Sequence, residues 1–305
     1  EVFKFSPDGQ VAWSWENGAR MSDSPSIADG KYYATCSSVP GKKPGQVFAL
    51  SMETGKKVWG TDIPDDVGSD IAGLGVHEGL VLASVGQSPH GGSARVACFN
   101  GSDGTKLWEY EPPTPLWNFS PMYTGKGSFL FQTENGDALH LRLADGKELW
   151  RVTRPGRGWT DGGMTLGPNG IAYVVHAEGH VASSPSALTP TQKSDISAYR
   201  VEDGKLLWRH HYDTPPNSWP VVVPFGDDKR LTVLFPYGGQ AYQSVAGVLT
   251  HTIQTSWTPL WAYPAIVRAY MALGSWGVWL ARMLPKSWFA GGLHADWPGG
   301  VTAFE

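Results

Sequence analysis

The feature that most constrains the fold is a glycine followed four residues later by a tryptophan, which occurs five times along the chain. The five segments read SPDGQVAW, METGKKVW, GSDGTKLW, LADGKELW and VEDGKLLW, with the pairs Gly9 and Trp13, Gly55 and Trp59, Gly104 and Trp108, Gly146 and Trp150, and Gly204 and Trp208. Successive tryptophans of the series are 46, 49, 42 and 58 residues apart, which is the range of propellers and other repeat arrays. The spacing predicts one structural unit that is copied along the chain.

Each copy predicts a β-hairpin. A short apolar run precedes the glycine, as in VFAL at Val47 and ISAY at Ile196, and a tight turn between two strands needs the positive φ that glycine adopts at little cost. Two more strand-like runs lie upstream, as in PSIADGKYYATC. Four antiparallel strands repeated about every 45 residues are typical of a β-propeller blade, in which the tryptophan of the last strand covers the neighbouring sheet.

The full pattern A-x-D-x-x-T-G-x-x-x-W, clearest in FALSMETGKKVW, resembles the tryptophan-docking repeat of the pyrroloquinoline-quinone-type β-propellers. The resemblance covers nearly all of residues 1–240 and implies an all-β fold of four-stranded antiparallel blades. That family includes quinone-dependent alcohol and sugar dehydrogenases as well as non-enzymatic scaffolds such as the outer-membrane assembly lipoprotein. The resemblance therefore implies the fold and leaves the activity open.

The repeats predict an N-terminal hairpin, four complete blades and a partial blade. The complete blades are expected at about residues 24–61, 68–110, 117–153 and 159–212. Two strands follow from Pro220, and VTAFE at 301–305 has the pattern of another third strand. If the N-terminal hairpin VFKFSPDGQVAWSW completes the blade begun at Pro220, the ring has five blades; the resembled family most often has eight, and VTAFE then opens a further blade. The predicted organisation is propeller blades at 1–240, an insertion at 241–300 and a returning strand at 301–305.

The insertion interrupts the repeat and predicts a helix over residues 265–284. The helix follows Pro264 and ends before Pro285, and its only charges are Arg268 and Arg282. An ordinary surface helix needs an apolar stripe only about 100° wide. A helix that is apolar nearly all round must therefore bury more of its surface away from water than such a helix does. Three kinds of cover remain open: the propeller itself, a protein partner, and a membrane. We expect the partner-binding residues to be Trp261, Tyr270, Trp276, Trp279 and Leu280.

The remaining composition argues against several classes of function. A net charge of −4 and a pI near 6.1 provide no basic surface for nucleic acid. The acidic residues Asp8, Asp103, Asp145 and Asp203 lie in the repeat turns, where turn geometry accounts for them. The two cysteines, Cys36 and Cys98, are far apart in sequence, so the adjacent-cysteine disulfide of many quinoprotein dehydrogenases is missing. The HAEGH segment at 176–180 is interpreted as loop histidines rather than a metal pair.

These observations predict a non-catalytic scaffold or accessory subunit that binds other protein subunits, with no cofactor, no metal site and no nucleic-acid partner. We expect a larger, membrane-associated complex, with a membrane protein or membrane surface contacted through residues 257–288. By resemblance the protein is expected to be extracytoplasmic, in a periplasm, an organelle lumen or a secretory compartment. Two alternatives remain: a quinone-dependent dehydrogenase or a degenerate relative of one, and a propeller that binds a glycan or another small ligand at its central mouth.

Overall fold

The fold is built of small antiparallel sheets that follow one another along the chain. The computed structural model describes residues 1–21, 24–67, 73–89, 92–155, 158, 160, 162–177, 194–212, 218–237 and 300–304, and these residues form strands and turns. The four complete sheets are β3 (Ser26–Ala28), β4 (Lys31–Cys36), β5 (Gly45–Ser51) and β6 (Lys57–Ile63); β7 (Leu74–His77), β8 (Leu80–Gln87), β9 (Ser93–Asn100) and β10 (Lys106–Tyr110); β11 (Met122–Tyr123), β12 (Ser128–Gln132), β13 (Ala138–Arg142) and β14 (Glu148–Val152); and β15 (Thr165–Leu166), β16 (Ile171–Ala177), β17 (Ser194–Arg200) and β18 (Leu206–Tyr212). The all-β architecture of four-stranded blades is thus confirmed.

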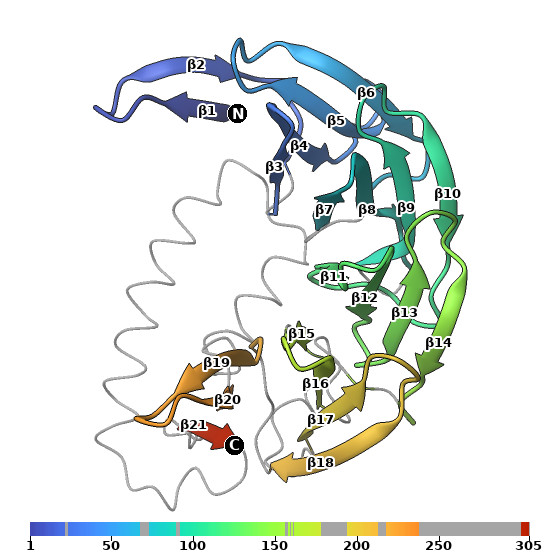
Figure 1. Ribbon diagram of the computed structural model, residues 1–305. Helices are drawn as coiled ribbons and strands as arrows, with labels where there is room; N and C mark the ends of the chain where they lie inside the picture. The colour runs from blue at the N-terminus through green and yellow to red at the C-terminus, as the bar shows by residue number, and fades with distance from the viewer. Residues whose placement is uncertain are drawn as a thin grey trace, which may run out of the picture.

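The sheets stand side by side in an arc (Figure 1), with the first strand of each blade on the inside and the fourth on the outer rim. Hydrophobic clusters fill the space between successive blades. In the first of these clusters Val47 and Trp59 of one blade pack with Val81 and Phe99 of the next. The core of this protein is therefore divided among the blade interfaces, and each blade needs its neighbours to bury its faces.

The tryptophans of the first four repeats dock onto the turn of the following blade. The indole N–H of each donates to a backbone carbonyl three residues before the next turn glycine: Trp13 to Met52 (3.1 Å), Trp59 to Gly101 (3.0 Å), Trp108 to Leu143 (3.0 Å) and Trp150 to Val201 (2.7 Å). The ladder shifts its register beside the tryptophan in each of these hairpins, for example between Ala49 and Leu50 opposite Trp59. Such a bulge bends the strand locally, and here it accompanies the docking contact of Trp13, Trp59, Trp108 and Trp150.

Two constraints act together on the turn glycines. Gly146 and Gly204 have φ of +69° and +71°, as the hairpin interpretation requires, and Gly9, Gly55 and Gly104 are also in the left-handed region. In addition, a Cβ would lie 2.7 Å from the Trp13 ring at Gly55, 2.5 Å from Trp59 at Gly104, 2.6 Å from Trp108 at Gly146 and 2.8 Å from Trp150 at Gly204. The repeat therefore pairs glycine and tryptophan because each glycine supports the tryptophan of the preceding blade.

The docking tryptophans are less buried than the sequence suggests. Trp59 is 7% exposed, whereas Trp108, Trp150 and Trp208 are half-buried. Trp208 packs against Tyr173 of its own blade, with ring centroids 5.9 Å apart.

The two ends of the arc are partial sheets. At the N-terminus β1 (Val2–Phe5) pairs with β2 (Val11–Trp15), and near the C-terminus β19 (Val221–Phe225), β20 (Arg230–Tyr237) and β21 (Gly300–Phe304) form a three-stranded sheet. The third strand beside β20 is therefore VTAFE, with Tyr237 opposite Gly300, and not the N-terminal hairpin. The pairing expected for a five-bladed ring is wrong on this point, because the returning strand already occupies the edge that the hairpin was expected to fill.

Candidate functional site

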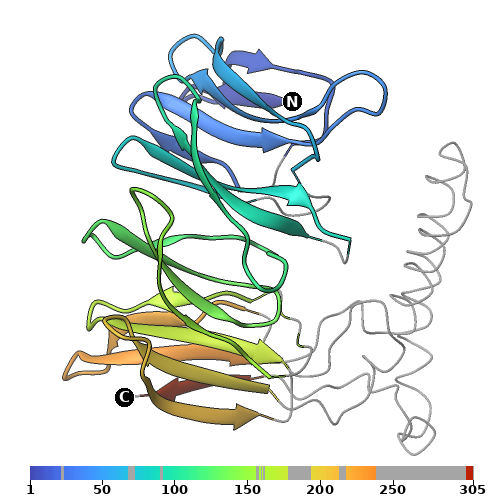
Figure 2. The same cartoon turned by 90° about the vertical axis from the view of Figure 1, so that its right-hand side faces the viewer.

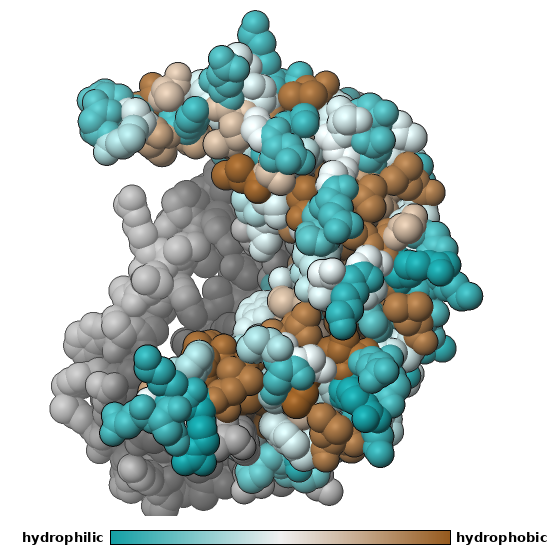
Figure 3. All heavy atoms as spheres, in the orientation of Figure 1, coloured by the Kyte–Doolittle hydropathy of each residue, from teal (hydrophilic) through white to brown (hydrophobic). Residues whose placement is uncertain are grey.

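The longest connections of the protein leave the sheets from one face. Ala177 lies opposite Ser194, which in turn lies opposite Tyr212, so the segments 178–193 and 213–217 start at the same end of that blade. Tyr237 opposite Gly300 places both ends of segment 238–299 together. We call this end of the sheets the loop face. The opposite end carries the repeated glycine turns, and we call it the turn face. Figure 2 shows the sheets from the side, with one face at each end of the strands. The turn face in Figure 3 presents apolar residues as separate spots between hydrophilic ones.

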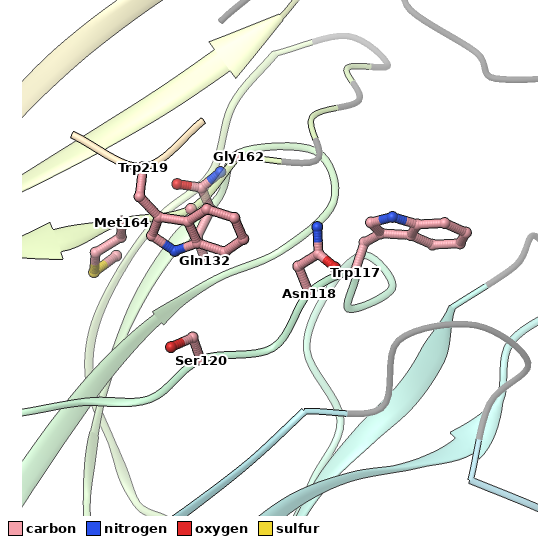
Figure 4. A pocket seen from close by; sticks show the side chains of 8 residues that line it. Trp117, Asn118, Ser120, Gln132, Gly162, Met164 and Trp219 are labelled. Atoms are coloured by element: carbon pink, nitrogen blue, oxygen red, sulfur yellow. The ribbon is translucent and has the colours of Figure 1, made fainter. Parts of the chain in front are cut away.

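The loop face contains a small pocket near the inside of the arc (Figure 4). Its walls come from the segments that lead into the inner strands β11, β15 and β19, together with the end of β12. The lining residues are Trp117, Asn118, Ser120, Gln132, Gly162, Gly163, Met164 and Trp219. The volume of about 10 Å³ is room for about one water molecule.

Glycine allows successive blades to approach each other at these lead-in segments. A Cβ on Gly73 would lie 1.7 Å from the carbonyl oxygen of Phe119, and one on Gly163 would lie 1.9 Å from the indole nitrogen of Trp219. Backbone and ring thus occupy the space where a side chain would stand. The inner ends of the blades therefore converge closely, and this convergence positions Trp219 against the pocket.

Gln132 is the unusual member of the pocket. It ends β12, it is 7% exposed, and neither the oxygen nor the nitrogen of its carboxamide has a hydrogen-bond partner among the residues that the structure describes. In Figure 4 its side chain lies beside the ring of Trp219, and Asn118 stands between it and Trp117. Buried polar groups in folded proteins are almost always hydrogen-bonded, to protein or to ordered water, and the neighbouring space has room for about one water molecule.

A second polar cluster lies beside the pocket on the same face. The fully buried carboxylate of Asp137 accepts hydrogen bonds from Thr114 Oγ1 (2.8 Å) and from the backbone N–H of Arg154 (2.6 Å). His176 Nδ1 lies 2.8 Å from the carbonyl oxygen of Asn135; because a carbonyl only accepts, this nitrogen carries the proton. The cluster ties the end of β13 to the segment after β14 and to β16.

Arg154 and Asp195 form a buried ion pair in this cluster, with side chains 6% and 5% exposed. Asp195 also accepts from Ser197 Oγ at 2.7 Å and faces Arg209 Nε at 3.5 Å. Two of the guanidinium nitrogens of Arg154, Nε and Nη1, have no hydrogen-bond partner in the described part of the chain. Because an unpaired buried charge is costly, we assign this pair first to fixing the blade junction.

The described residues offer little reactive chemistry. Cys36 and Cys98 are free, buried and in different blades, and burial raises the pKa of the Cys98 thiol to about 12, so it is not a thiolate at neutral pH. Within the described ranges no three His, Cys, Asp or Glu side chains are grouped so that they could hold a metal ion. The same ranges contain no helix that could cross a membrane.

Sequence reasoning and structure emphasise different residues. The partner-binding residues predicted in the insertion, Trp261, Tyr270, Trp276, Trp279 and Leu280, lie outside the described residues, as does the predicted helix 265–284. Gln132, Arg154 and Asp195 were not predicted from the sequence, because a single polar residue in or beside a strand forms no recognisable pattern. Trp117 and Trp219 were recognisable in principle, since they stand outside the glycine-tryptophan spacing and near a proline that leads into an inner strand.

Comparisons with known proteins agree with this geometry. The model of the family described as "Outer membrane protein assembly factor BamB" matches residues 1–161, just over half of the chain. The outer membrane protein assembly factor BamB of Xanthomonas campestris pv. campestris is 27% identical over 314 aligned positions, which cover 83% of this chain and 72% of that protein.

Quinoproteins share part of the same similarity. The quinohemoprotein alcohol dehydrogenase ADH IIB of Pseudomonas putida is 25% identical over 183 positions, covering 57% of this chain but only 24% of that enzyme. The structure of a europium-containing methanol dehydrogenase superposes with a TM-score of 0.54 at 14% identity and covers 75% of this chain and 49% of that one. At this level of identity the superposition shows a common fold and nothing about activity.

Proposed function

Because the chain belongs to the family of outer membrane protein assembly factor BamB, we propose that it is a non-catalytic scaffold subunit of a membrane-associated complex that assembles outer membrane proteins. The relative from Xanthomonas campestris carries that role in its name. An extracytoplasmic location follows from the same proposal, since outer membrane proteins are assembled outside the cytoplasm.

The observation that carries this proposal is the division of the molecule into two faces. Blade after blade, the turn face repeats one tryptophan-glycine contact, which suits a rigid framework. The loop face bears the two longest connections, 178–193 and 238–299, together with the pocket and the buried ion pair. Binding residues are commonly placed on loops that a rigid scaffold positions, so we place the protein partners on the loop face.

The role in assembly is tested by deleting the gene in the source cell and measuring folded outer membrane proteins by their heat-modifiable mobility in gels. We expect their amount to fall and to be restored by the full chain. Unchanged levels of folded outer membrane proteins in the deletion strain would contradict the proposed function.

The contribution of residues 257–288 is tested by complementation with a variant that lacks Pro259–Lys286. Because the pairing of Tyr237 with Gly300 anchors both ends of the segment, the variant is expected to keep its strand signal in circular dichroism. We expect it to fail both in complementation and in co-purification with membrane proteins of the complex. Loss of the strand signal would show that the fold depends on this segment. Full complementation by the variant would show that the segment is not needed for binding the partners.

A dehydrogenase is the second candidate, favoured by the similarity to the enzyme from Pseudomonas putida. That similarity covers only 24% of the enzyme, and no described group of acidic side chains, cysteines and histidines forms a metal site. The test is dye-linked alcohol oxidation by the purified chain with added pyrroloquinoline quinone and Ca²⁺. Turnover with stoichiometric cofactor would replace the scaffold proposal; we expect none.

A further inference from the structure

Asparagine is followed directly by glycine at four places in the chain, at Asn17, Asn100, Asn135 and Asn169. Such pairs undergo deamidation, in which the backbone nitrogen of the glycine attacks the side-chain amide of the asparagine, and the missing glycine side chain leaves room for this attack. We propose that Asn17 is a site of spontaneous deamidation in the folded protein, because the structure activates this pair and protects the other three. This modification does not depend on the proposed function.

The glycine nitrogen is the attacking atom, and in three of the four pairs it is already hydrogen-bonded. The backbone N–H donates to a carbonyl oxygen in each of them: Gly101 to Gly79 (2.8 Å), Gly136 to Thr133 (2.9 Å) and Gly170 to Gly167 (3.1 Å). These turns must open locally before the nitrogen can attack. Gly18, by contrast, is exposed, and its N–H has no hydrogen-bond partner in the described part of the chain. The pair at Asn17 therefore reacts without first breaking a backbone hydrogen bond of the nucleophile.

A lysine acts on the peptide bond that joins Asn17 to Gly18. The ammonium group of Lys43 donates to the backbone carbonyl oxygen of Asn17 at 2.7 Å. When the Gly18 nitrogen loses its proton, negative charge spreads through the peptide group onto that oxygen. Because a nearby cation stabilises an anion, Lys43 makes the attacking form of the nitrogen easier to reach.

The side-chain amide of Asn17 is held in place for the same reaction. Its Oδ1 accepts a hydrogen bond from the backbone N–H of Ala19 at 2.9 Å. A donor at this oxygen stabilises the negative charge that develops on it during the attack. Its Nδ2 donates to the sulfur of Cys36 at 3.0 Å, which fixes the orientation of the amide. Both partners of the reaction are thus positioned at Asn17.

The only co-reactant is water. The Gly18 nitrogen gives its proton to solvent and forms a bond to Cγ of Asn17; the bond from Cγ to Nδ2 breaks, and Nδ2 takes up a proton from solvent and leaves as ammonia. Water then opens the cyclic imide at either carbonyl, which gives aspartate or isoaspartate. The product carries one more negative charge and cannot donate to Cys36. A contact between the segment after β2 and the end of β4 is therefore lost.

The experiment incubates the full folded chain at mildly alkaline pH and follows all four pairs by chromatographic peptide mapping with mass spectrometry. We expect Asn17 to convert first. Lys43→Met should slow this conversion about tenfold, which corresponds to one charge-assisted hydrogen bond, and Lys43→Arg should keep most of the rate. Lys42→Met is the matched control and should leave the rate unchanged, since Lys42 is exposed and makes no hydrogen bond to Asn17.

The same measurement in urea separates the contribution of the structure from that of the sequence. All four pairs should convert at similar rates in the unfolded chain, and Lys43→Met should have no effect there. Circular dichroism checks that each variant is folded during the incubation without urea. Faster conversion at Asn100, Asn135 or Asn169 in the folded chain would overturn the proposal. It would also be overturned by an unchanged Asn17 rate in Lys43→Met, or by the same preference for Asn17 in urea.

Discussion

The turn face and the loop face are the two ends of the same sheets, but the first repeats one contact between blades and the second does not. On the turn face the Trp13, Trp59, Trp108 and Trp150 indoles make the same hydrogen bond to the next blade. On the loop face the residues that lead into successive inner strands differ at every blade: Trp117–Ser120 before β11, Gly162–Met164 before β15 and Trp219 before β19. The repeated contact holds blades together, and the differences among the lead-in segments are available for recognition.

Burial separates the two faces in the same way. The ion pairs of the turn face, such as Arg142 with Asp145 and Arg200 with Asp203, are exposed and local, with partners three residues apart. One pair of the loop face, Arg154 with Asp195, is buried and joins neighbouring blades. The exposed pairs of the turn face therefore contribute mainly to the local turns, whereas this buried pair contributes to the stability of a blade junction.

The largest expected effect concerns this buried pair. Asp195→Ala leaves the Arg154 guanidinium buried without its carboxylate, which should lower the free energy of unfolding by about 3–5 kcal/mol. The control Arg200→Ala breaks an exposed pair and should change stability little. Chemical denaturation of both variants measures the difference, and equal losses would erase the distinction between the faces.

Removal of a docking tryptophan comes next. Trp59→Ala should cost about 3–5 kcal/mol as a large-to-small change in a core, since Trp59 is 7% exposed. Trp108→Ala should cost less, because Trp108 is only partly buried. Urea midpoints compare the two variants; a larger loss at Trp108 would show that docking onto the next turn, rather than burial, determines the contribution.

Two glycines of one blade test whether the tryptophan contact adds to the turn. Gly146 and Gly125 have φ of +69° and +71°, but only at Gly146 would a Cβ meet an indole, at 2.6 Å from Trp108. Gly125→Ala should therefore show only the cost of the left-handed backbone, about 1–2 kcal/mol. Gly146→Ala should lose about 1–3 kcal/mol more through overpacking. Equal losses in thermal denaturation would mean that the ring moves aside freely.

The smallest effect is the pH dependence of one blade junction. His140 lies under Trp150, with ring centroids 5.3 Å apart, and its Nε2 is 2.8 Å from Ser128 Oγ. Burial lowers its pKa below the ordinary value, although a backbone hydrogen bond at Val201 opposes this. The unfolded chain thus binds the proton more readily, so the stability due to neutral His140 is complete above about pH 6.5 and declines as the pH falls through the lowered pKa.

His140→Ala is the matched variant, because Ala49 and Ala198 occupy the same place opposite the tryptophan in two other blades. Urea unfolding at a series of pH values should show a weaker decline on the acid side for this variant than for the wild type. His211→Gln, which changes an exposed histidine, should keep the decline of the wild type. An identical decline in all three proteins would place the titrating group elsewhere.

The sequence predicts the repeated parts of this protein well and the unrepeated parts poorly. Gly55 and Trp59 are evident from their spacing alone, because the contact between blades recurs and requires the same two residue types at the same spacing each time. The unpartnered state of Gln132 depends on how three blades converge, which no local pattern records. The wrong pairing of the N-terminal hairpin has a related cause, since an open strand edge can be filled by any segment with alternating apolar residues.

The pairing of β20 with β21 has a consequence for how the protein acquires its structure. Within each complete blade every strand pairs with its immediate neighbour in the sequence, so those contacts form early and with little loop-closure entropy. The contact of Tyr237 with Gly300 spans 62 intervening residues and closes a much longer loop. We therefore expect β21 to be the last strand of its sheet to join during refolding. The closure entropy grows only with the logarithm of loop length, by about 0.6 kcal/mol for each doubling, so the same junction tolerates insertions of very different lengths without loss of the sheet.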